Sequence, residues 1–451
     1  MADPTQDPRD SGADALPDQI GKYKVRARIG QGATSEVFLA HDSFLGIDVA
    51  VKRLRRDLMS NAYGAKVQQR FFAAEAALVG RLWHPNLVRI YDAVADGNPP
   101  YVVMEYVKGE TLARYCQPDA LLALEQILEI GFKCAMALDY VYRQGVIHRD
   151  VKPANILTKQ EGDVLVDVKI SDFGSAFNLA SERTQIYRVG SLAYMSPEQL
   201  DGDPLDCRAD IYALAATLYH LVAGRPPFDG TQQQVVMNQI FNAQPASLQG
   251  QREGVAARLD GLILASMSKA REDRPATWLE FARRLSAVVS DPMLRRSELQ
   301  AVLDSERFNL LRSLDFFAGF GDVEIWEVVH RASWQRFDVG HVIHRKGEEG
   351  DAFHILALGE IEVWRDDDRV AQLGPGSSVG EMAYLAPSRE LKRHSVDVRV
   401  SQPATTISFT PQAIAQLSVG AQHLFDKAFN HVLVRRLHAA HEALYHPRRV
   451  F

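Results

Sequence analysis

A short stretch between two apolar runs combines an acid, a base and an amide. From residue 145 to residue 159 the chain reads GVIHRDVKPANILTK, so that Asp150, Lys152 and Asn155 lie close together before a segment typical of a strand. A carboxylate so placed can orient a hydroxyl and accept its proton. An amide oxygen can help to hold a hard cation such as Mg²⁺. The spacing from Asp150 to Asn155 predicts that both lie on one loop and face one site.

Two glycines and a serine near the N-terminus indicate a phosphate-binding hairpin. In the segment IGQGATSEV, Gly30 and Gly32 fall between two predicted strands, where missing side chains let backbone amides approach phosphate oxygens. Ser35 stands where a third glycine is usual in such loops. On its own, the glycine pattern is a weak indication of a phosphate-binding hairpin, and it needs supporting motifs elsewhere in the chain.

Charged residues further along supply those motifs. Lys52 lies in VAVKRL, a strand pattern in which an inward-facing lysine needs an anion. Glu75 lies in RFFAAEAALVGRL, whose apolar residues recur at helical spacing, and a pair between Glu75 and Lys52 would hold the lysine against phosphates. Asp172, in the DFG triplet, adds a second carboxylate for metal ions. Taken singly, Lys52 and Glu75 are better explained as solvent-exposed residues.

Together these motifs resemble the eukaryotic-like serine/threonine protein kinases. The resemblance covers about residues 23–289 and follows the family's order through GQG, VAVK, Glu75, HPN, MEYVKGETL, HRDVKPAN, DFG, MSPE, DIYALA and DRP. It implies a bilobal α+β kinase fold that binds ATP and Mg²⁺ and phosphorylates protein substrates. Lys152, two residues after Asp150, matches the pattern for Ser or Thr acceptors rather than Tyr.

The same resemblance implies a role for individual residues. Asp150 would be the catalytic base, Lys152 would steady the γ-phosphate, and Lys52, held by Glu75, would contact the α- and β-phosphates. Asn155 and Asp172 would bind Mg²⁺. The cofactor-binding residues would be Gly30, Gly32, Val37, Ala50, Lys52, Glu105, Val107, Asn155 and Asp172.

Regulation and scaffolding residues follow from the same family pattern. Arg149 would pair with a phosphate on the segment between DFG and SPE, and we predict Thr184 as the autophosphorylated residue, with a solvated loop residue as the alternative. Ser175, Ser181, Tyr187 and Ser191 share that segment, and Ser191 would shape the substrate pocket. Glu198 with Arg274 would form a structural ion pair, and Asp210 would anchor the start of a helix.

The organisation of the chain is predicted from its periodicity. We expect a disordered tail (1–20), a kinase domain (21–290), a linker (291–306), a compact strand-rich domain (307–435) and the end of a C-terminal helix with a tail (436–451). Within the kinase domain, strands from Tyr23 precede a helix over 65–81, two further strands and a large helical lobe from 121.

The strand-rich region, about residues 308–435, resembles the cyclic nucleotide-binding domains, with a β-roll and flanking helices. Gly380 and Glu381 in VGEMAYL match the phosphate cassette, in which a Glu binds the ribose and an Arg the cyclic phosphate. Strand alternation should put Val396, Val398 and Val400 on one apolar face. That register places Lys392 at the phosphate position, with Arg393 and Arg389 as the neighbouring cations.

Three interpretations of this domain remain open. It binds cAMP or cGMP through Glu381 and Arg393 or Arg389, it binds another anionic ligand, or it is a docking or homodimerisation module without a ligand that uses the helix over 421–444. If a ligand binds, we expect it to regulate the kinase. The rival for the whole chain is a catalytically idle scaffold.

Composition excludes several other classes. The 451 residues are 46% hydrophobic and 24% charged, which is ordinary for a globular protein of two or three domains. The net charge of −6 argues against nucleic acid as a partner. No apolar segment is long enough to span a membrane, and the three spaced cysteines, Cys116, Cys134 and Cys207, fit buried thiols. We therefore expect a cytoplasmic protein that is not attached to a membrane.

Overall fold

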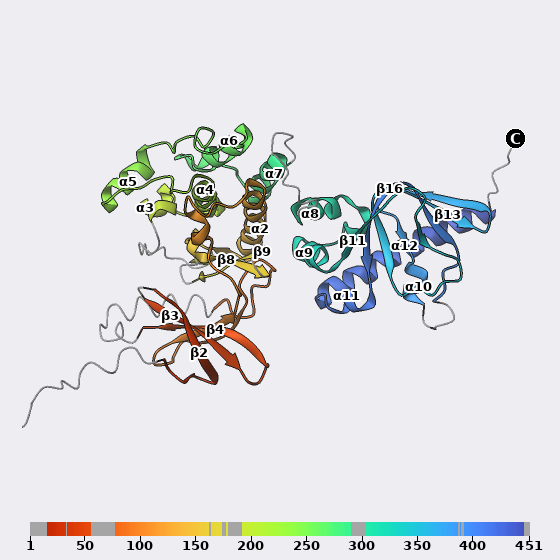
Figure 1. Ribbon diagram of the computed structural model, residues 1–451, viewed down its shortest axis with the longest axis horizontal. Helices are drawn as coiled ribbons and strands as arrows, with labels where there is room; N and C mark the ends of the chain where they lie inside the picture. Colours follow the sequence, from red (N-terminus) through yellow and green to blue (C-terminus); the bar gives the residue numbers. More distant parts are fainter. Residues whose placement is uncertain are drawn as a thin grey trace, which may run out of the picture. The chain divides into compact units, whose positions relative to one another are not determined.

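The chain forms two compact units, residues 1–298 and residues 299–451. The computed structural model describes residues 16–32, 34–55, 77–161, 164–173, 177–178, 192–289, 304–386, 388 and 392–445. Elements of both units carry their labels in Figure 1. The combination of strands and helices in each unit is the α+β class that the sequence predicts.

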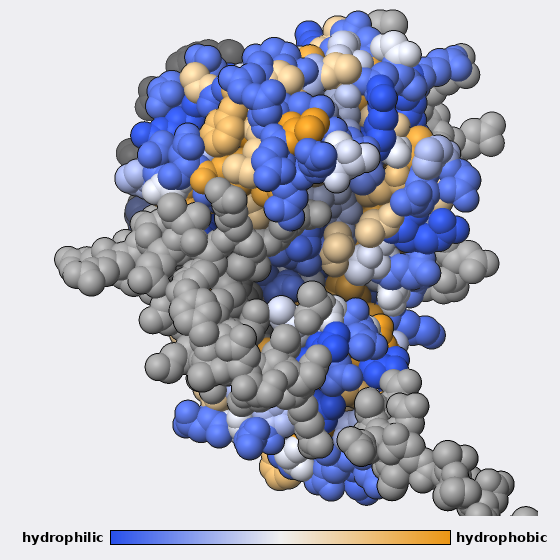
Figure 2. All heavy atoms as spheres, turned by 90° about the vertical axis from the view of Figure 1, so that its left-hand side faces the viewer, coloured by the Kyte–Doolittle hydropathy of each residue, from blue (hydrophilic) through white to orange (hydrophobic). Residues whose placement is uncertain are grey.

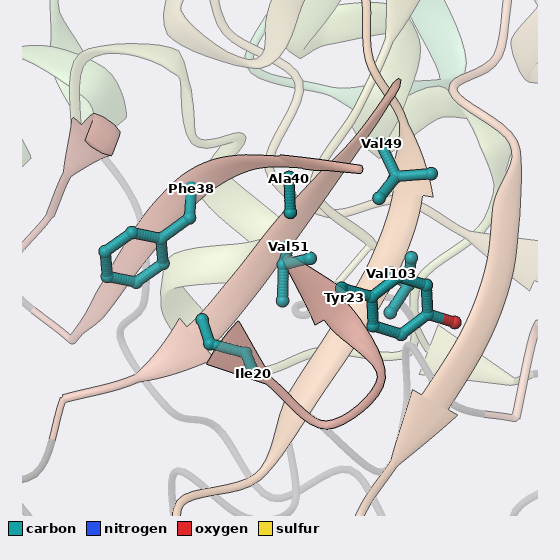
Figure 3. Close-up of a cluster of buried hydrophobic side chains, with 7 residues drawn as sticks. All are labelled: Ile20, Tyr23, Phe38, Ala40, Val49, Val51 and Val103. Atoms are coloured by element: carbon teal, nitrogen blue, oxygen red, sulfur yellow. The ribbon is translucent and has the colours of Figure 1, made fainter. Parts of the chain in front are cut away.

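The first unit begins with a six-stranded antiparallel sheet in the order β1-β2-β3-β4-β6-β5. Apolar residues from several strands gather on one face, where Ile20, Tyr23, Phe38, Ala40, Val49, Val51 and Val103 form one buried cluster (Figure 3). The strands are β1 (Gln19–Ile20), β2 (Tyr23–Gln31), β3 (Ser35–Asp42), β4 (Ile47–Leu54), β5 (Ile90–Val94) and β6 (Tyr101–Glu105).

Two details differ from the sequence-based expectation. Gln19 and Ile20 pair with Lys24 and Tyr23, so regular structure begins inside the predicted tail of residues 1–20, because Ile20 is buried in the sheet core. The helix predicted over 65–81 lies mainly outside the described residues, and its last part, 77–81, forms turns.

Helices make up most of the rest of the first unit. Helix α2 has an apolar face recurring at helical spacing, and it packs against α4 and α7. Helix α4 is buried on almost all sides. The helices are α2 (Leu124–Arg143), α3 (Pro197–Asp201), α4 (Cys207–Ala223), α5 (Gln233–Asn242), α6 (Ala257–Ser266) and α7 (Trp278–Val289).

Short strands between the sheet and the helices position the HRDVKPAN and DFG motifs. The hairpin β8 (Ile156–Glu161) and β9 (Val164–Ile170) follows the HRDVKPAN segment, which confirms the predicted strand after Asn155. A two-stranded pair, β7 (Val146–Ile147) with β10 (Phe177–Asn178), flanks the same segment on its other side. Figure 1 shows β8 and β9 between the six-stranded sheet and the helices.

The second unit is a strand-rich roll with helices before and after it. Its main sheet runs β11-β16-β13-β14, with β12 on β16 and β15 on β13. Val398 and Val400 are buried and Val396 packs against the same core cluster, which confirms the predicted apolar face. The strands are β11 (Ser333–Phe337), β12 (Val342–His344), β13 (Phe353–Arg365), β14 (Asp368–Leu373), β15 (Ser378–Val379) and β16 (Asp397–Phe409).

Aromatic side chains attach the helices of this unit to the roll. Phe425 and Phe429 of α12 lie 6.1 and 4.7 Å, between ring centroids, from Phe353 of β13. The Ser418 backbone amide and hydroxyl, just before α12, donate hydrogen bonds of 2.6 and 2.7 Å to Glu327. The helices are α8 (Asp304–Ser313), α9 (Asp322–Arg331), α10 (Glu381–Leu385), α11 (Pro411–Ala415) and α12 (Val419–Tyr445).

The surface and the thiols agree with the composition. The face drawn in Figure 2 is mostly hydrophilic, with hydrophobic residues in small groups. All three cysteines are buried and unpaired, as predicted, and burial raises the pKa of each thiol to about 12. None of the described helices is both long and apolar enough to cross a membrane.

Candidate active site

The carboxylate of Asp150 is held by two neighbours on its own loop. Lys152 Nζ lies 2.8 Å from Asp150 Oδ2, and Asn155 Nδ2 donates to both the main-chain oxygen and Oδ2 of Asp150 at 2.8 and 2.9 Å. The loop therefore brings the acid, the base and the amide together as the sequence predicts. Burial raises the pKa of Asp150, Lys152 opposes that shift, and the nearby charge of Asp172 adds to it.

A buried aspartate fixes this loop through hydrogen bonds to its backbone. Asp210, in the first turn of α4, accepts hydrogen bonds of 2.8 Å from the backbone amides of His148 and Arg149. These bonds hold Arg149 at a φ of 68°, in the left-handed region that side chains rarely adopt. Asp210 thus anchors the loop that carries Asp150, whereas the side chain that caps the start of α4 is that of Asp206.

Lys52 and Asp172 meet opposite this loop. Lys52 on β4 places its Nζ 2.7 Å from Asp172 Oδ1, although the two residues are far apart in the sequence. The Lys52 side chain is only 13% exposed, so its charge is available to an anion inside the site rather than to bulk water. The Asp172 segment is tied to the loop because the Ser171 amide donates to the Asn155 carbonyl at 2.8 Å.

The other predicted nucleotide-binding residues line the neighbouring strands. Gly30 pairs with Val37 across β2 and β3, and the Gly32 amide donates to the Ser35 carbonyl at 2.8 Å, which gives the predicted hairpin. Val37 in turn pairs with Lys52. Ala50, 6% exposed, and Val107, 8% exposed, are both buried.

Glu105 is engaged away from these residues. Its carboxylate lies 3.1 Å from Lys169 Nζ, and both residues line a cavity of about 210 Å³ together with Trp83, Pro85 and Tyr91. A contact between Glu105 and a nucleotide would therefore use its main chain.

Three predicted site residues cannot be placed. Glu75, Thr184 and Arg389 lie outside the described residues, as do Ser175, Ser181, Tyr187 and Ser191. Arg149, the predicted phosphate partner, is largely enclosed, and burial lowers the pKa of its guanidinium while the nearby Asp210 opposes that effect.

The predicted structural ion pair of the helical lobe is present. Arg274 Nη1 and Nη2 donate to Glu198 Oε1 and Oε2 at 2.7 and 2.9 Å, and the Arg274 side chain is fully buried. A two-pronged pair of this kind fixes both side chains.

The oxygen atoms of Asn155 and Asp172 suit a hard cation that is also bound by phosphate oxygens of a ligand. Asn155 uses its Nδ2 toward Asp150, which leaves Oδ1 as the atom able to bind a metal ion, and Asp172 contributes a carboxylate. No cluster of three or more His, Cys, Asp or Glu suited to a metal ion occurs among the residues that the structure describes. This arrangement suits Mg²⁺, which commonly uses one or two protein ligands together with phosphate oxygens.

The second unit places the cassette residues beside its last helix. Glu381, at the start of α10, is almost completely buried and forms an ion pair through Oε1 with Arg436 Nη1 of α12. Arg436 Nη2 also donates to the Ser378 carbonyl at 2.6 Å. Gly380 has a φ of 83°, so the turn before α10 needs a glycine.

Of the three cations predicted for a phosphate, the structure describes Lys392 and Arg393, and no hydrogen bond or ion pair between either of them and Glu381 is seen. Arg393 is exposed, and its Nη1 donates to the Gly347 carbonyl at 2.7 Å. Lys392 is partly buried, and its carbonyl accepts from the Gly350 amide. Arg436, which sequence analysis missed, is the arginine that reaches the carboxylate, and nothing in the helical pattern of α12 distinguishes it from the adjacent Arg435.

Comparison with known proteins agrees with this geometry. Residues 23–287 match the protein kinase domain, more than half of the chain, and the chain therefore belongs to the protein kinase family. Residues 334–419 match the cyclic nucleotide-binding domain.

Bacterial proteins similar to this chain are named as serine/threonine-protein kinases. The chain is 37% identical over 300 residues to the serine/threonine-protein kinase PknB of Mycobacterium leprae, covering 65% of this chain and 46% of the relative. It is 33% identical over 291 residues to a probable serine/threonine-protein kinase of Clostridium acetobutylicum, covering 63% and 42%. The chain thus spans under half the length of these relatives.

Proposed function

We propose that the chain is a serine/threonine protein kinase that transfers the γ-phosphate of ATP to Ser or Thr hydroxyls of protein substrates. The observation that carries this proposal is the position of Asp150, which Lys152 and Asn155 hold on a loop anchored by Asp210. The relatives' names and the family match support the same class.

Each residue of the loop has a separate task in the proposed reaction. Asp150 orients the acceptor hydroxyl and takes its proton, and its raised pKa brings it closer to that task at neutral pH. Lys152, 2.8 Å from Asp150, balances the negative charge that gathers there. An idle scaffold would have no need of an enclosed carboxylate in this position.

Charge neutralisation would come from other residues of the site, including Asn155 of the same loop. Asn155 and Asp172 would hold Mg²⁺, which neutralises phosphate charge when bound. Lys52 would contact the α- and β-phosphates, with Glu75 as its helical partner, and the backbone around Gly30 and Gly32 would cover them. Val37, Ala50, Glu105 and Val107 would border the nucleotide.

Phosphate incorporation by the full chain tests the proposal. With Mg-ATP and labelled γ-phosphate, we expect incorporation into Ser and Thr and none into Tyr. Asp150→Asn keeps the shape but removes the base, and we expect the rate to fall by about 100-fold to 10,000-fold.

The matched control is Asp203→Asn, an exposed aspartate of the same unit, which should retain the full rate. Equal rates for the two variants, or no incorporation by the unaltered chain with any acceptor protein, would contradict the kinase proposal. Mapping the modified residue would also test Thr184, which we propose as the autophosphorylation site that Arg149 engages.

The second unit suggests a regulatory function. We propose that it takes a cyclic nucleotide, cAMP or cGMP, at Glu381 and that binding changes kinase activity. The supporting observation is that Glu381 is buried but only one of its oxygens, Oε1, has a hydrogen-bond partner within the described part of the chain.

Calorimetric titration of the full chain with cAMP and cGMP, beside autophosphorylation rates, tests this role. Binding with a changed rate supports it, provided that the ligand distinguishes two states of the protein. Binding without a changed rate argues against regulation, and no binding favours a docking or homodimerisation module.

A further inference from the structure

Three histidines cluster in the second unit beside the cassette. The rings of His344 on β12 and His394 lie 3.9 Å apart between centroids, and those of His344 and His354 on β13 lie 4.9 Å apart. His354 Nδ1 is 2.6 Å from the hydroxyl of Ser408 on β16. The sequence shows these residues only as single polar positions in alternating strands, because the roll brings them together from three segments.

The cluster adjoins the turn that begins α10. His344 Nε2 lies 3.1 Å from the position that a Cβ would take at Gly380. His344 is 6% exposed, and its Nε2 has no hydrogen-bond partner among the described residues. Buried polar atoms in folded proteins are normally paired, so an unpaired one needs an explanation.

Two more unpaired atoms belong to residues beside Gly380 in the sequence. Ser378 Oγ and Glu381 Oε2 are buried without a partner in the described chain, and these residues flank Gly380 within four positions. A hydroxyl, a carboxylate oxygen and an imidazole nitrogen left unpaired together indicate a site for a polar ligand rather than a defect of packing.

Neither of the two arginines that the structure describes near this corner, formed by the histidine cluster and the turn at Gly380, is directed at a phosphate position. Arg393 donates to Gly347 and Arg436 pairs with Glu381, so both described arginines are otherwise engaged. A phosphate enclosed without a cation would be strongly unfavourable. Among the side chains that the structure describes in this corner, an imidazole is the kind that can acquire a positive charge near neutral pH.

The surroundings keep the cluster neutral when nothing is bound. Burial and the neighbouring imidazoles lower the pKa of His344 to about 3 and of His354 to about 4. Burial also lowers the pKa of His394, and Glu348 on the adjoining turn opposes that effect. Glu381 and Arg436, which pair with each other, are also charged. The remaining described charges near the cluster lie on the segment of His394 and on the turn opposite it, and they are Glu349, Lys392 and Arg393.

We propose that His344, His354 and His394 form the phosphate-binding part of this site and that the phosphodiester of a cyclic nucleotide binds together with one proton, taken up by this cluster. The protonated imidazole then supplies the positive charge that an arginine would otherwise provide. The proposal rests on the ligand-binding role of the second unit given above, and it adds which groups meet the phosphate.

Proton uptake on binding predicts the direction in which cyclic nucleotide affinity changes with pH. The phosphodiester charge is constant between pH 5.5 and 7.5, whereas the proposed cluster is neutral when free and charged when bound. Affinity should therefore rise as the pH falls, by up to about tenfold for each pH unit. Adenosine, which has the ring system but no phosphate, should show no such dependence.

Calorimetry of the full chain in two buffers of different ionisation enthalpy measures the protons directly. With cAMP and cGMP as the probes at pH 5.5, 6.5 and 7.5, we expect uptake of about one proton per ligand. Chemical shifts of ¹⁵N-labelled histidines should show one imidazole becoming protonated when the nucleotide is added.

Variants separate the cluster from other histidines. His344→Gln and the more accessible His394→Gln keep a polar side chain without the titration, and each should reduce proton uptake and cyclic nucleotide affinity by at least tenfold at pH 6.5. His341→Gln is the matched control, because His341 is exposed and only three residues from His344.

Each contrary outcome identifies what fails. Cyclic nucleotide binding that is independent of pH and unchanged in His344→Gln and His394→Gln would overturn the histidine proposal and leave the ligand-binding role intact. Absence of binding at every pH would overturn both. If His344→Gln does not fold, His394→Gln and the histidine spectra of the unaltered chain still decide the question.

Discussion

Glu198 in the kinase domain and Glu381 in the roll are both buried glutamates that meet an arginine from a distant segment. Both oxygens of Glu198 are bonded by Arg274, whose side chain is fully enclosed. Glu381 uses one oxygen, and its partner Arg436 is 43% exposed. In the first pair both carboxylate oxygens are hydrogen-bonded. In the second pair Glu381 Oε2 has no partner among the described residues and could accept a hydrogen bond from a ligand, and the arginine is accessible to water. Burial of the charge therefore does not by itself distinguish the two carboxylates, whereas the bonding of their oxygens does.

The largest expected effect concerns the pair of Glu198 and Arg274. Arg274→Met should lower the free energy of unfolding of the kinase domain by about 3 to 5 kcal/mol, because the Glu198 carboxylate stays buried without a counter-ion. Urea denaturation measures this. The control Arg271→Met removes a partly exposed arginine paired with Glu272, and it should change stability by less than about 1 kcal/mol. Similar losses of stability in both variants would show that burial of an ion pair does not determine how much it contributes to stability.

A smaller effect is expected at the pair of Glu381 and Arg436. Arg436→Gln should raise the affinity of the full chain for cAMP or cGMP roughly tenfold, because a competing contact worth about 1 to 1.5 kcal/mol is removed. Calorimetric titration gives the constants. Arg435→Gln changes the neighbouring, exposed arginine of the same helix and should leave affinity unaltered. Equal affinities in the two variants would mean that Arg436 does not compete with the ligand.

The smallest effect is a displacement of a pH profile. Lys152 lowers the pKa of Asp150 against the larger effect of burial. Since the base acts only when ionised, activity falls as the pH drops through this pKa. Lys152→Met should move that acidic limb to higher pH, apart from its effect on the maximum rate. The dependence of kcat/KM on pH measures the limb, and Lys159→Met, an exposed lysine on β8, is the control. An unmoved limb would show that Asp150 is not the titrating base.

Sequence patterns sufficed where partners are close along the chain or belong to a long ordered motif. Asp150, Lys152 and Asn155 are on one loop, and the sequence already placed them together. Lys52 and Asp172 are distant in sequence, but each has a motif of its own, and both were identified. The apolar alternation of Val396, Val398 and Val400 also predicted the face of β16 correctly.

Other features could not be predicted because no local pattern encodes them. Arg436 reaches Glu381 from a helix 55 residues later, and its neighbour Arg435 has the same chemistry without the contact. The three histidines come from β12, β13 and the segment before β16, so that only the closed roll reveals their cluster. The ordered strand at Gln19 was missed because two residues are too few to show alternation.

The buried thiols make the protein a convenient host for site-directed labelling. All three cysteines of the chain are enclosed, and thiols with a pKa of about 12 are almost wholly unreactive toward maleimides at neutral pH. A single cysteine introduced at an exposed position, such as Arg435→Cys on α12, would therefore carry a fluorophore without prior removal of the native ones. The movement of that helix could then be followed by spectroscopy in an otherwise unaltered chain.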